Sequence, residues 1–225
     1  MIRLTRILVA IAMGISMQNQ ESSEVKVKKK IQKRTLESRD KLLKAAYELF
    51  VEKGYYNTNT KEIVKKAGIS VGNFYNYYKD KADIYLALTT IHLESSYSNT
   101  VHLFQDLEKL SKSQAQNYIM MYVHEQLVRA SKTVRFFDDS KVIEKENKEL
   151  AIIIKETEQK IIKVLENALR RLRKTAPKIS FSVMARMLYV TVNEVSNDII
   201  KVEDEKEREE YIETLVDFIV SYTYD

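Results

Sequence analysis

The sequence predicts an all-α protein. Its 225 residues include one proline and four glycines, too few for the many tight turns of a β-rich fold. Apolar residues recur at helical spacing along most of the chain, and residues that commonly cap helices stand at several of the breaks. A chain of this length forms one large domain or two small ones. Cysteine is absent, which removes disulfides and thiolate chemistry.

The first 18 residues combine a basic start with a short apolar run. Arg3 and Arg6 precede the run Ile7–Ile15, as in a secretory signal, but the run is too short to cross a bilayer comfortably. Two other readings stay open besides an export signal. The apolar leader is incidental, or translation truly starts at Met17, which precedes the polar residues 18–24.

Positive charge is concentrated towards the amino end. Residues 24–81 carry 15 Lys/Arg and 7 Asp/Glu, a net charge of +8, whereas residues 82–225 carry a net charge of −4. This split indicates a nucleic-acid-binding end joined to another part, or simply a solvated helical surface of uneven charge. Residues 19–35 form either a flexible basic arm that adds phosphate contacts or a solvated lead-in to the first helix.

The first predicted helix runs from about Leu36 to Lys53, and Gly54 ends it. It should be the scaffold on which the next helices pack, through a buried stripe of Leu42, Ala45, Ala46, Leu49 and Phe50.

Two short helices joined by a tight turn follow in the stretch Asn59–Lys81. Asn59 and Glu62 form a capping-box pattern at the start of the first. Gly68 can adopt the left-handed backbone that ends it, and Ser70 is placed to cap the second. Two helices with a glycine-containing turn form a helix-turn-helix, whose second helix can enter the major groove of DNA.

Residues 36–96 resemble the DNA-binding domain of TetR-type transcriptional regulators. The family's pattern is matched in register by Ala45, Ala46, Phe50, Gly54, Tyr55, Thr58, Asn59, Ile63, Ala67, Gly68, Ser70, Gly72, Tyr75, Tyr77, Tyr78 and Lys81. The departures are mild: Asn59 stands where Ser or Thr is usual, Val64 replaces Ala, Ile69 replaces Val, and Asn73 replaces Thr or Ser. Asn59 keeps the capping role. Asn73 lies where base or phosphate contacts are expected, so this departure concerns the operator sequence that is recognised.

The resemblance implies three regions. Residues 1–35 are a leader and basic arm, residues 36–96 are the helix-turn-helix DNA-binding domain with its motif at 59–78, and residues 97–225 are a helical domain for effector binding and dimerisation. A helix from Asp80 to about Ser96 links the two domains. In the family, an effector changes the tilt of this helix.

The resemblance also implies which side chains contact DNA: Asn59, Thr60, Lys61, Ser70, Val71, Gly72, Asn73, Tyr75, Asn76, Tyr77 and Lys81. Tyr75, Tyr77 and Lys81 would donate to phosphates, which fixes the register without reading sequence. The residues expected to face bases are Val71, Gly72, Asn73 and Asn76, because Asn can bridge adenine and Val can touch a thymine methyl. Simple packing is the alternative for Tyr77, and Phe74 and Tyr78 are expected in the core.

The rest of the chain contains no identifying motif, and its periodicity is helical. Helices are predicted near residues 99–110, 114–131, 141–174, 179–201 and 205–223. Pro177 should separate the third from the fourth, because proline resists a helix interior. Residues 202–204 should separate the last two, and Phe136–Ser140 reads as a connection between helices.

The last two predicted helices carry broad apolar faces. One contains Met184, Met187, Leu188, Thr191, Val192, Val195 and Ile199, and the other contains Ile212, Leu215, Val216, Phe218, Ile219 and Tyr222. In the family, the final two helices of each subunit form a four-helix dimer interface; the alternative is ordinary core within one chain. A homodimer also fits the DNA, since two recognition helices about 34 Å apart read a near-palindrome.

The resemblance further implies a small-molecule effector, of a kind that the sequence leaves open, in an apolar pocket of the helical domain. Candidate lining residues are His92, Phe104, Tyr118, Tyr122, Phe137, Tyr189 and Asn193, with Tyr97, Met121 and Phe136 as further candidates. Each could instead be ordinary core. The three histidines show no metal-binding spacing, so neither a metal nor another cofactor is expected.

We therefore expect a cytoplasmic DNA-binding transcriptional regulator, a repressor that an effector releases from a near-palindromic operator. On this reading an incidental leader or a start at Met17 is favoured over an export signal. An enzyme is not expected, because the chain lacks cysteine and a glycine-rich phosphate loop and has few histidines. The alternative is a DNA-anchored interaction protein whose C-terminal domain binds a protein partner and no metabolite.

Overall fold

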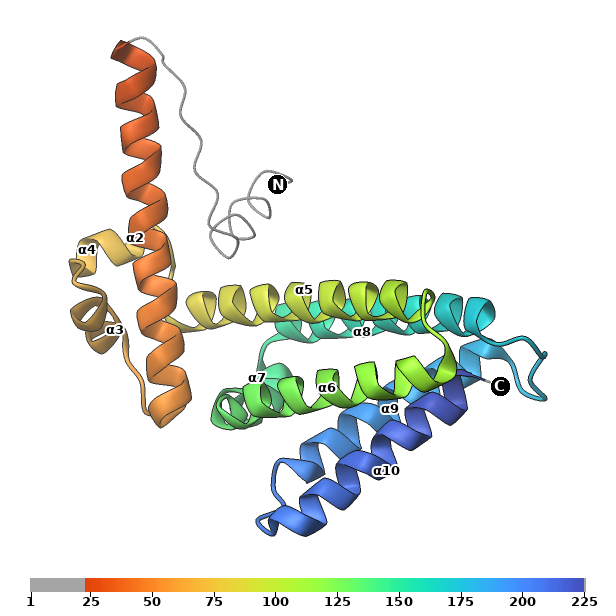
Figure 1. The fold of residues 1–225 in the computed structure, drawn as a ribbon. Helices are drawn as coiled ribbons and strands as arrows, with labels where there is room; N and C mark the ends of the chain where they lie inside the picture. The colour runs from red at the N-terminus through yellow and green to blue at the C-terminus, as the bar shows by residue number, and fades with distance from the viewer. Residues whose placement is uncertain (1–22, 225) are drawn as a thin grey trace. The chain divides into compact units, whose positions relative to one another are not determined.

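The computed structural model describes the backbone of residues 23–224 and the side chains from Thr35 to Tyr224. All regular secondary structure in this part of the chain is helical, which confirms the predicted all-α class (Figure 1). The predictions for the leader and for a start at Met17 concern residues that lie outside the described ones. The chain divides into two units, residues 1–41 and 42–225.

The described part of the first unit is the amino-terminal portion of helix α2 (Ser23–Lys53). Because this helix starts at Ser23, the predicted start at Leu36 is wrong, and residues 23–35 are helical where a flexible arm was one expectation. The reason is local, since Ser23–Lys53 contains neither glycine nor proline and is rich in good helix formers.

The second unit begins within α2 and contains the remaining helices. These are α3 (Thr60–Ala67), α4 (Val71–Tyr75), α5 (Lys81–Leu107), α6 (Lys112–Ser131), α7 (Val134–Glu146), α8 (Lys148–Leu172), α9 (Phe181–Ile199) and α10 (Glu205–Thr223). A polar residue accepts a hydrogen bond from a backbone N–H of the first turn at most of these starts, namely Asn59, Ser70, Asp80, Ser111, Asn147, Ser180 and Asp204. The predicted breaks near Pro177 and at residues 202–204 are confirmed.

Two predicted connections are wrong. Helix α5 runs unbroken to Leu107, because Lys81–Leu107 contains neither glycine nor proline and the buried Phe104 and Leu107 anchor its last turn in the core. The segment Phe136–Ser140 lies inside α7, not between helices, since Phe136 is buried and holds this turn against the core. The break instead falls at Asn147, whose side chain caps α8.

Two hydrophobic cores form inside the second unit. The first joins α2, α3, α4, the start of α5, α7 and the start of α8. At its centre the Tyr85 ring lies 5.3 Å from Phe50 and 4.7 Å from Phe136, measured between centroids. The second joins the end of α5 to α6, α8, α9 and α10. Helix α5 lies along α8, and α10 packs on both α6 and α9 (Figure 1). Among the described residues, no helix is both long and apolar enough to cross a membrane.

Candidate nucleic-acid interface

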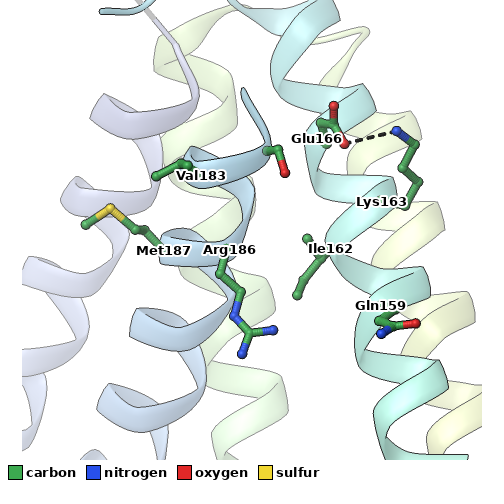
Figure 2. A pocket seen from close by; sticks show the side chains of 8 residues that line it. Gln159, Ile162, Lys163, Glu166, Val183, Arg186 and Met187 are labelled. Atoms are coloured by element: carbon green, nitrogen blue, oxygen red, sulfur yellow. Dashed lines mark hydrogen bonds and ion pairs between the residues drawn. The ribbon is translucent and has the colours of Figure 1, made fainter. Parts of the chain in front are cut away.

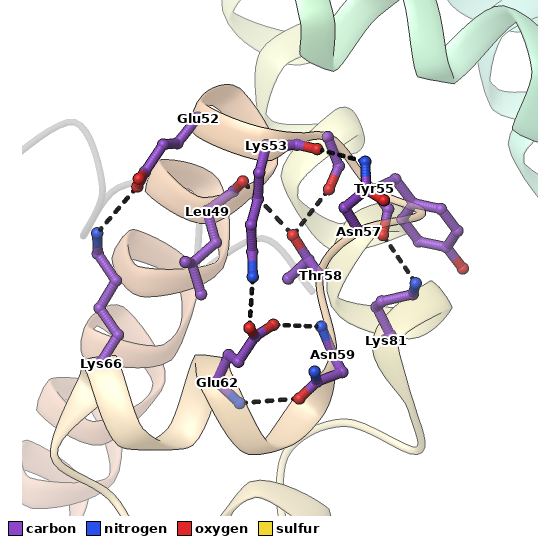
Figure 3. Close-up of polar contacts among 11 residues, drawn as sticks. Leu49, Glu52, Lys53, Tyr55, Asn57, Thr58, Asn59, Glu62, Lys66 and Lys81 are labelled. Atoms are coloured by element: carbon purple, nitrogen blue, oxygen red, sulfur yellow. Dashed lines mark hydrogen bonds and ion pairs between the residues drawn. The ribbon is translucent and has the colours of Figure 1, made fainter.

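Helix α3 is fixed at both ends by short-range hydrogen bonds. Asn59 Oδ1 accepts from the Glu62 amide at 3.1 Å, and Glu62 Oε2 accepts from the Asn59 amide at 3.0 Å, which completes the predicted capping box (Figure 3). At the other end, Gly68 takes the left-handed conformation with φ of 65°. Ile63 on the inner face is fully buried.

Charged side chains attach α3 to the end of α2. The Lys53 Nζ donates to Glu62 Oε1 at 2.5 Å, and Lys66 forms an ion pair with Glu48 at 3.2 Å. The hydrogen bonds from Lys53 and from the Asn59 amide hold the pKa of Glu62 below its usual value. The capping carboxylate is therefore ionised at neutral pH. Its negative charge interacts favourably with the positive, amino-terminal end of the α3 dipole.

Helix α4 is short and presents its outer face to solvent. Ser70 caps it by accepting from the Asn73 amide at 3.3 Å, and Phe74 is fully buried beneath it. Val71 and Tyr75 are 46% and 58% exposed, large values for apolar and aromatic side chains on a helix that is otherwise well anchored. Asn76 is exposed, and its Nδ2 donates to Asn73 Oδ1 at 3.3 Å.

The predicted DNA contacts fall into two groups in the structure. The exposed ones are Asn59, Lys61, Ser70, Val71, Gly72, Tyr75 and Asn76, and the half-buried ones are Thr60, Asn73, Tyr77 and Lys81. Phe74 and Tyr78 are buried, as expected. Anchored helices thus expose donors, acceptors and small side chains along one surface, which suits contact with a nucleic-acid groove.

Lys81 is engaged within the protein. Its Nζ donates to the Tyr55 carbonyl at 2.7 Å and lies 4.1 Å from the centroid of the Tyr55 ring (Figure 3). Burial lowers the pKa of Lys81, while the nearby Asp139 carboxylate acts in the opposite direction. In this structure Lys81 therefore connects the start of α5 to the turn before α3, in place of extending freely toward a phosphate.

Sequence reasoning missed the role of the turn between α2 and α3. The Tyr55 amide donates to Asp139 Oδ2 at 2.6 Å, and Arg135 Nη1 donates to the Glu52 carbonyl at 2.6 Å. Both side chains belong to α7, far along the chain. The local signal in the sequence was Gly54, because glycine readily takes the left-handed backbone, and its φ in the structure is 84°.

The predicted effector residues are divided between the two cores. Phe137 packs at the edge of the first core, with its ring 4.4 Å from that of the exposed His92. Phe104 is buried in the second core, while Tyr118 and Tyr189 pack against it. Tyr122 is half-buried and Asn193 is exposed.

A groove in the described part of the chain lies elsewhere, between α8 and α9, with a volume of about 450 Å³. It is lined by Gln159, Ile162, Lys163, Glu166, Ser182, Val183, Arg186 and Met187, and Figure 2 shows Ile162 and Arg186 reaching into the space between the helices. None of the predicted effector residues lines it, nor a smaller groove along α10. The described residues contain no cluster of His, Cys, Asp and Glu that could hold a metal ion.

Comparison with known proteins supports the DNA-binding part of the chain. Residues 42–88 match the family model described as "Bacterial regulatory proteins, tetR family". The chain is 43% identical over 53 residues to the transcriptional regulator QacR of Staphylococcus aureus, covering 24% of this chain and 28% of QacR. It is 38% identical over 65 residues to the regulator HbdR of Aromatoleum sp., covering 29% of this chain and 28% of HbdR. The match thus spans just over a quarter of these curated relatives.

Structural similarity to solved proteins covers more of the chain than the sequence similarity does. The crystal structure of a TetR-family regulator from Mesorhizobium loti superposes with a TM-score of 0.68, covering 84% of this chain and 97% of the other. The two are 14% identical, so this likeness concerns the fold alone.

Proposed function

We propose that this chain, whose residues 42–88 match the TetR family model, represses transcription by binding a near-palindromic operator as a homodimer, and that a small-molecule effector releases it. The observation that carries the proposal is the exposed surface of α4. Phe74 anchors this helix from below, while Val71, Tyr75 and Asn76 face outward. The half-buried Asn73 and the backbone at Gly72 complete the surface that reads the major groove.

Two substitutions, at Tyr75 in the last turn of α4 and at the C-cap Asn76, separate phosphate contacts from base contacts. Tyr75→Phe removes only the hydroxyl, so it should weaken binding to all DNA sequences alike. Asn76→Ala should weaken operator binding by about 1–3 kcal/mol and relax the preference at one base pair. The exposed Asn117 on α6 supplies a control, because Asn117→Ala removes the same group away from the motif.

The measurement is fluorescence anisotropy with DNA from upstream of the protein's own gene, against a scrambled duplex of the same length. Genomic fragments selected by the protein supply the operator if that region does not bind. Wild-type binding that shows no preference for any fragment would refute operator recognition. If Asn117→Ala lost as much operator affinity as Asn76→Ala, the assignment of the DNA-binding surface to α4 would be refuted.

An exposed apolar stripe on α9 supports the homodimer. Val183, Met187 and Val190 recur at helical spacing and are 48%, 50% and 43% exposed. Tyr211 on the neighbouring α10 is 44% exposed. A stripe of this kind along paired helices is typical of a surface that another subunit covers.

A matched pair of methionine variants tests this interface. Met187→Glu places a charge in the stripe and should give monomers with greatly reduced operator affinity, measured by sedimentation velocity and anisotropy. Met121→Glu is the control, because Met121 on α6 is even more exposed at 73%. Dimers that persist in Met187→Glu would rule out this stripe as the interface.

A second function, in which the helical domain binds a protein partner and no metabolite, is supported by the lining of the α8–α9 groove, which includes none of the predicted effector residues. A ligand releases DNA only by binding the two states of the protein with different affinity. Host-cell extract divided by size therefore discriminates the two functions. Release of the operator by the small-molecule fraction supports an effector, and release by the macromolecular fraction alone supports the second function.

A further inference from the structure

The end of α2 and the turn that follows it, residues Glu52–Tyr55, are held by charged side chains from two other helices. From α7, Arg135 Nη1 donates to the Glu52 carbonyl and Asp139 Oδ2 accepts from the Tyr55 amide, both at 2.6 Å. From α5, Lys81 Nζ donates to the Tyr55 carbonyl at 2.7 Å. Hydrogen bonds with one ionised partner are about twice as strong as neutral ones. Both polar groups of the Tyr55 backbone thus have a charged partner.

The fit between α7 and this turn depends on Gly54. A Cβ atom at this position would lie 2.9 Å from Asp139 Oδ2 and 3.4 Å from Arg135 Cδ. The absence of a side chain therefore lets both α7 residues reach the backbone. Helix α7 is held in place independently, because Phe136 is buried and its carbonyl accepts from the Tyr85 hydroxyl at 2.7 Å.

The position of the turn is transmitted directly to α3. Thr58, only 2% exposed, donates from its hydroxyl to the Gly54 carbonyl at 2.7 Å. Asn59 follows at once and caps α3. Between Tyr55 and Asn59, the Thr58 amide donates to the Tyr55 carbonyl at 3.2 Å and Asn57 Nδ2 donates to the Lys53 carbonyl at 3.0 Å, so hydrogen bonds close the turn that leads to the capped start of α3.

We propose that Asp139 is a positioning residue for DNA binding. Its carboxylate holds the Tyr55 amide, and with it the turn that sets where α3 begins and how α4 is presented. Asp139 does not touch DNA; it acts through the turn. The inference rests on the proposed function, and it adds a direct connection from α7 of the helical domain to the DNA-reading helices.

The test compares Asp139→Ala with Asp139→Asn, which keeps an acceptor oxygen, and with Asp138→Ala, which alters the exposed neighbour on the same helix. Three quantities are measured: the hydrogen-exchange rate of the Tyr55 amide by NMR, the affinity for operator and for scrambled DNA, and the unfolding temperature. Asp139→Ala should exchange the Tyr55 amide about tenfold faster or more and bind operator about tenfold more weakly. Its affinity for scrambled DNA should stay unchanged. Asp139→Asn should recover part of both losses, and Asp138→Ala should match the wild type.

Each outcome decides one step. An unchanged Tyr55 exchange rate in Asp139→Ala would show that the Asp139 carboxylate does not protect the Tyr55 amide, and that α7 does not hold the turn through this bond. Faster exchange with unchanged operator affinity would overturn the positioning role. An equal loss of affinity for operator and scrambled DNA, with a much lower unfolding temperature, would show a structural role only. A wild type that binds no DNA would overturn the proposed function itself. The Tyr55 exchange rate would still decide whether Asp139 holds the Tyr55 amide.

Discussion

Three glycines of the DNA-binding region give a graded test of the turn geometry. Gly68 has a φ of 65°, and an added Cβ would meet nothing within 4 Å, so Gly68→Ala should cost only the backbone strain of about 1–2 kcal/mol. Gly54 has a φ of 84°, and its Cβ would also collide with Asp139. Gly54→Ala should therefore add the loss of a charged hydrogen bond, which brings the total to about 2.5–5 kcal/mol.

The assay is thermal unfolding of each variant at one fixed protein concentration, because dimer stability depends on concentration. For a chain of this size, each kcal/mol lowers the unfolding temperature by about 2–4 °C. Gly68→Ala should then unfold about 2–8 °C below the wild type, and Gly54→Ala about 5–20 °C below it. Gly72→Ala is the control: Gly72 lies within α4 with open space around it, so alanine should leave stability unchanged or raise it slightly.

A double-mutant cycle isolates the collision from the backbone strain. If Gly54→Ala already breaks the bond between Asp139 and Tyr55, then Asp139→Ala should cost much less in the Gly54→Ala background than in the wild type. Equal losses for Gly54→Ala and Gly68→Ala, or full additivity in the cycle, would refute the reasoning.

Two further predictions concern hydrogen bonds made by one side chain each. Tyr85→Phe removes the buried bond to the Phe136 carbonyl and should lower the free energy of unfolding by about 1–2 kcal/mol, measured by urea denaturation. The depressed pKa of Glu62, due first to Lys53 and then to the Asn59 amide, stabilises the fold above the unfolded-state pKa of about 4.3, and this contribution is lost as pH falls through the lower folded-state pKa. The unfolding temperature of Glu62→Gln should accordingly fall less than that of the wild type between about pH 6 and pH 3, and parallel curves for the two proteins would contradict this account.

Sequence reasoning succeeded where the determinant is local. The capping box at Asn59, the left-handed Gly68 and the cap at Ser70 each depend on residues within one helical turn, so their spacing alone predicts them. The burial of Phe74 followed from its place among polar neighbours on a short helix.

It failed where the determinant is distant. Tyr55 and Asp139 are 84 positions apart, and nothing in either local sequence indicates that they meet. The segment Phe136–Ser140 was predicted as a connection, whereas the burial of Phe136 against distant residues keeps it helical. Aromatic composition likewise could not show which of the effector candidates lie near each other, because Phe104 and Phe137 contribute to different cores.

The unbroken length of α5 has a mechanical consequence. With 27 residues and a rise of 1.5 Å per residue, it is a rod about 40 Å long. Tyr85 near one end lies in the first core, and Leu107 at the other lies in the second. A tilt of only about 5° about one end displaces the other by about 3.5 Å, which exceeds the length of the bond from Lys81 to the Tyr55 carbonyl. If the second core tilts α5 by a few degrees, the displacement at the amino-terminal end of α5 is therefore large enough to form or break the bond from Lys81 to the turn that precedes the DNA-reading helices.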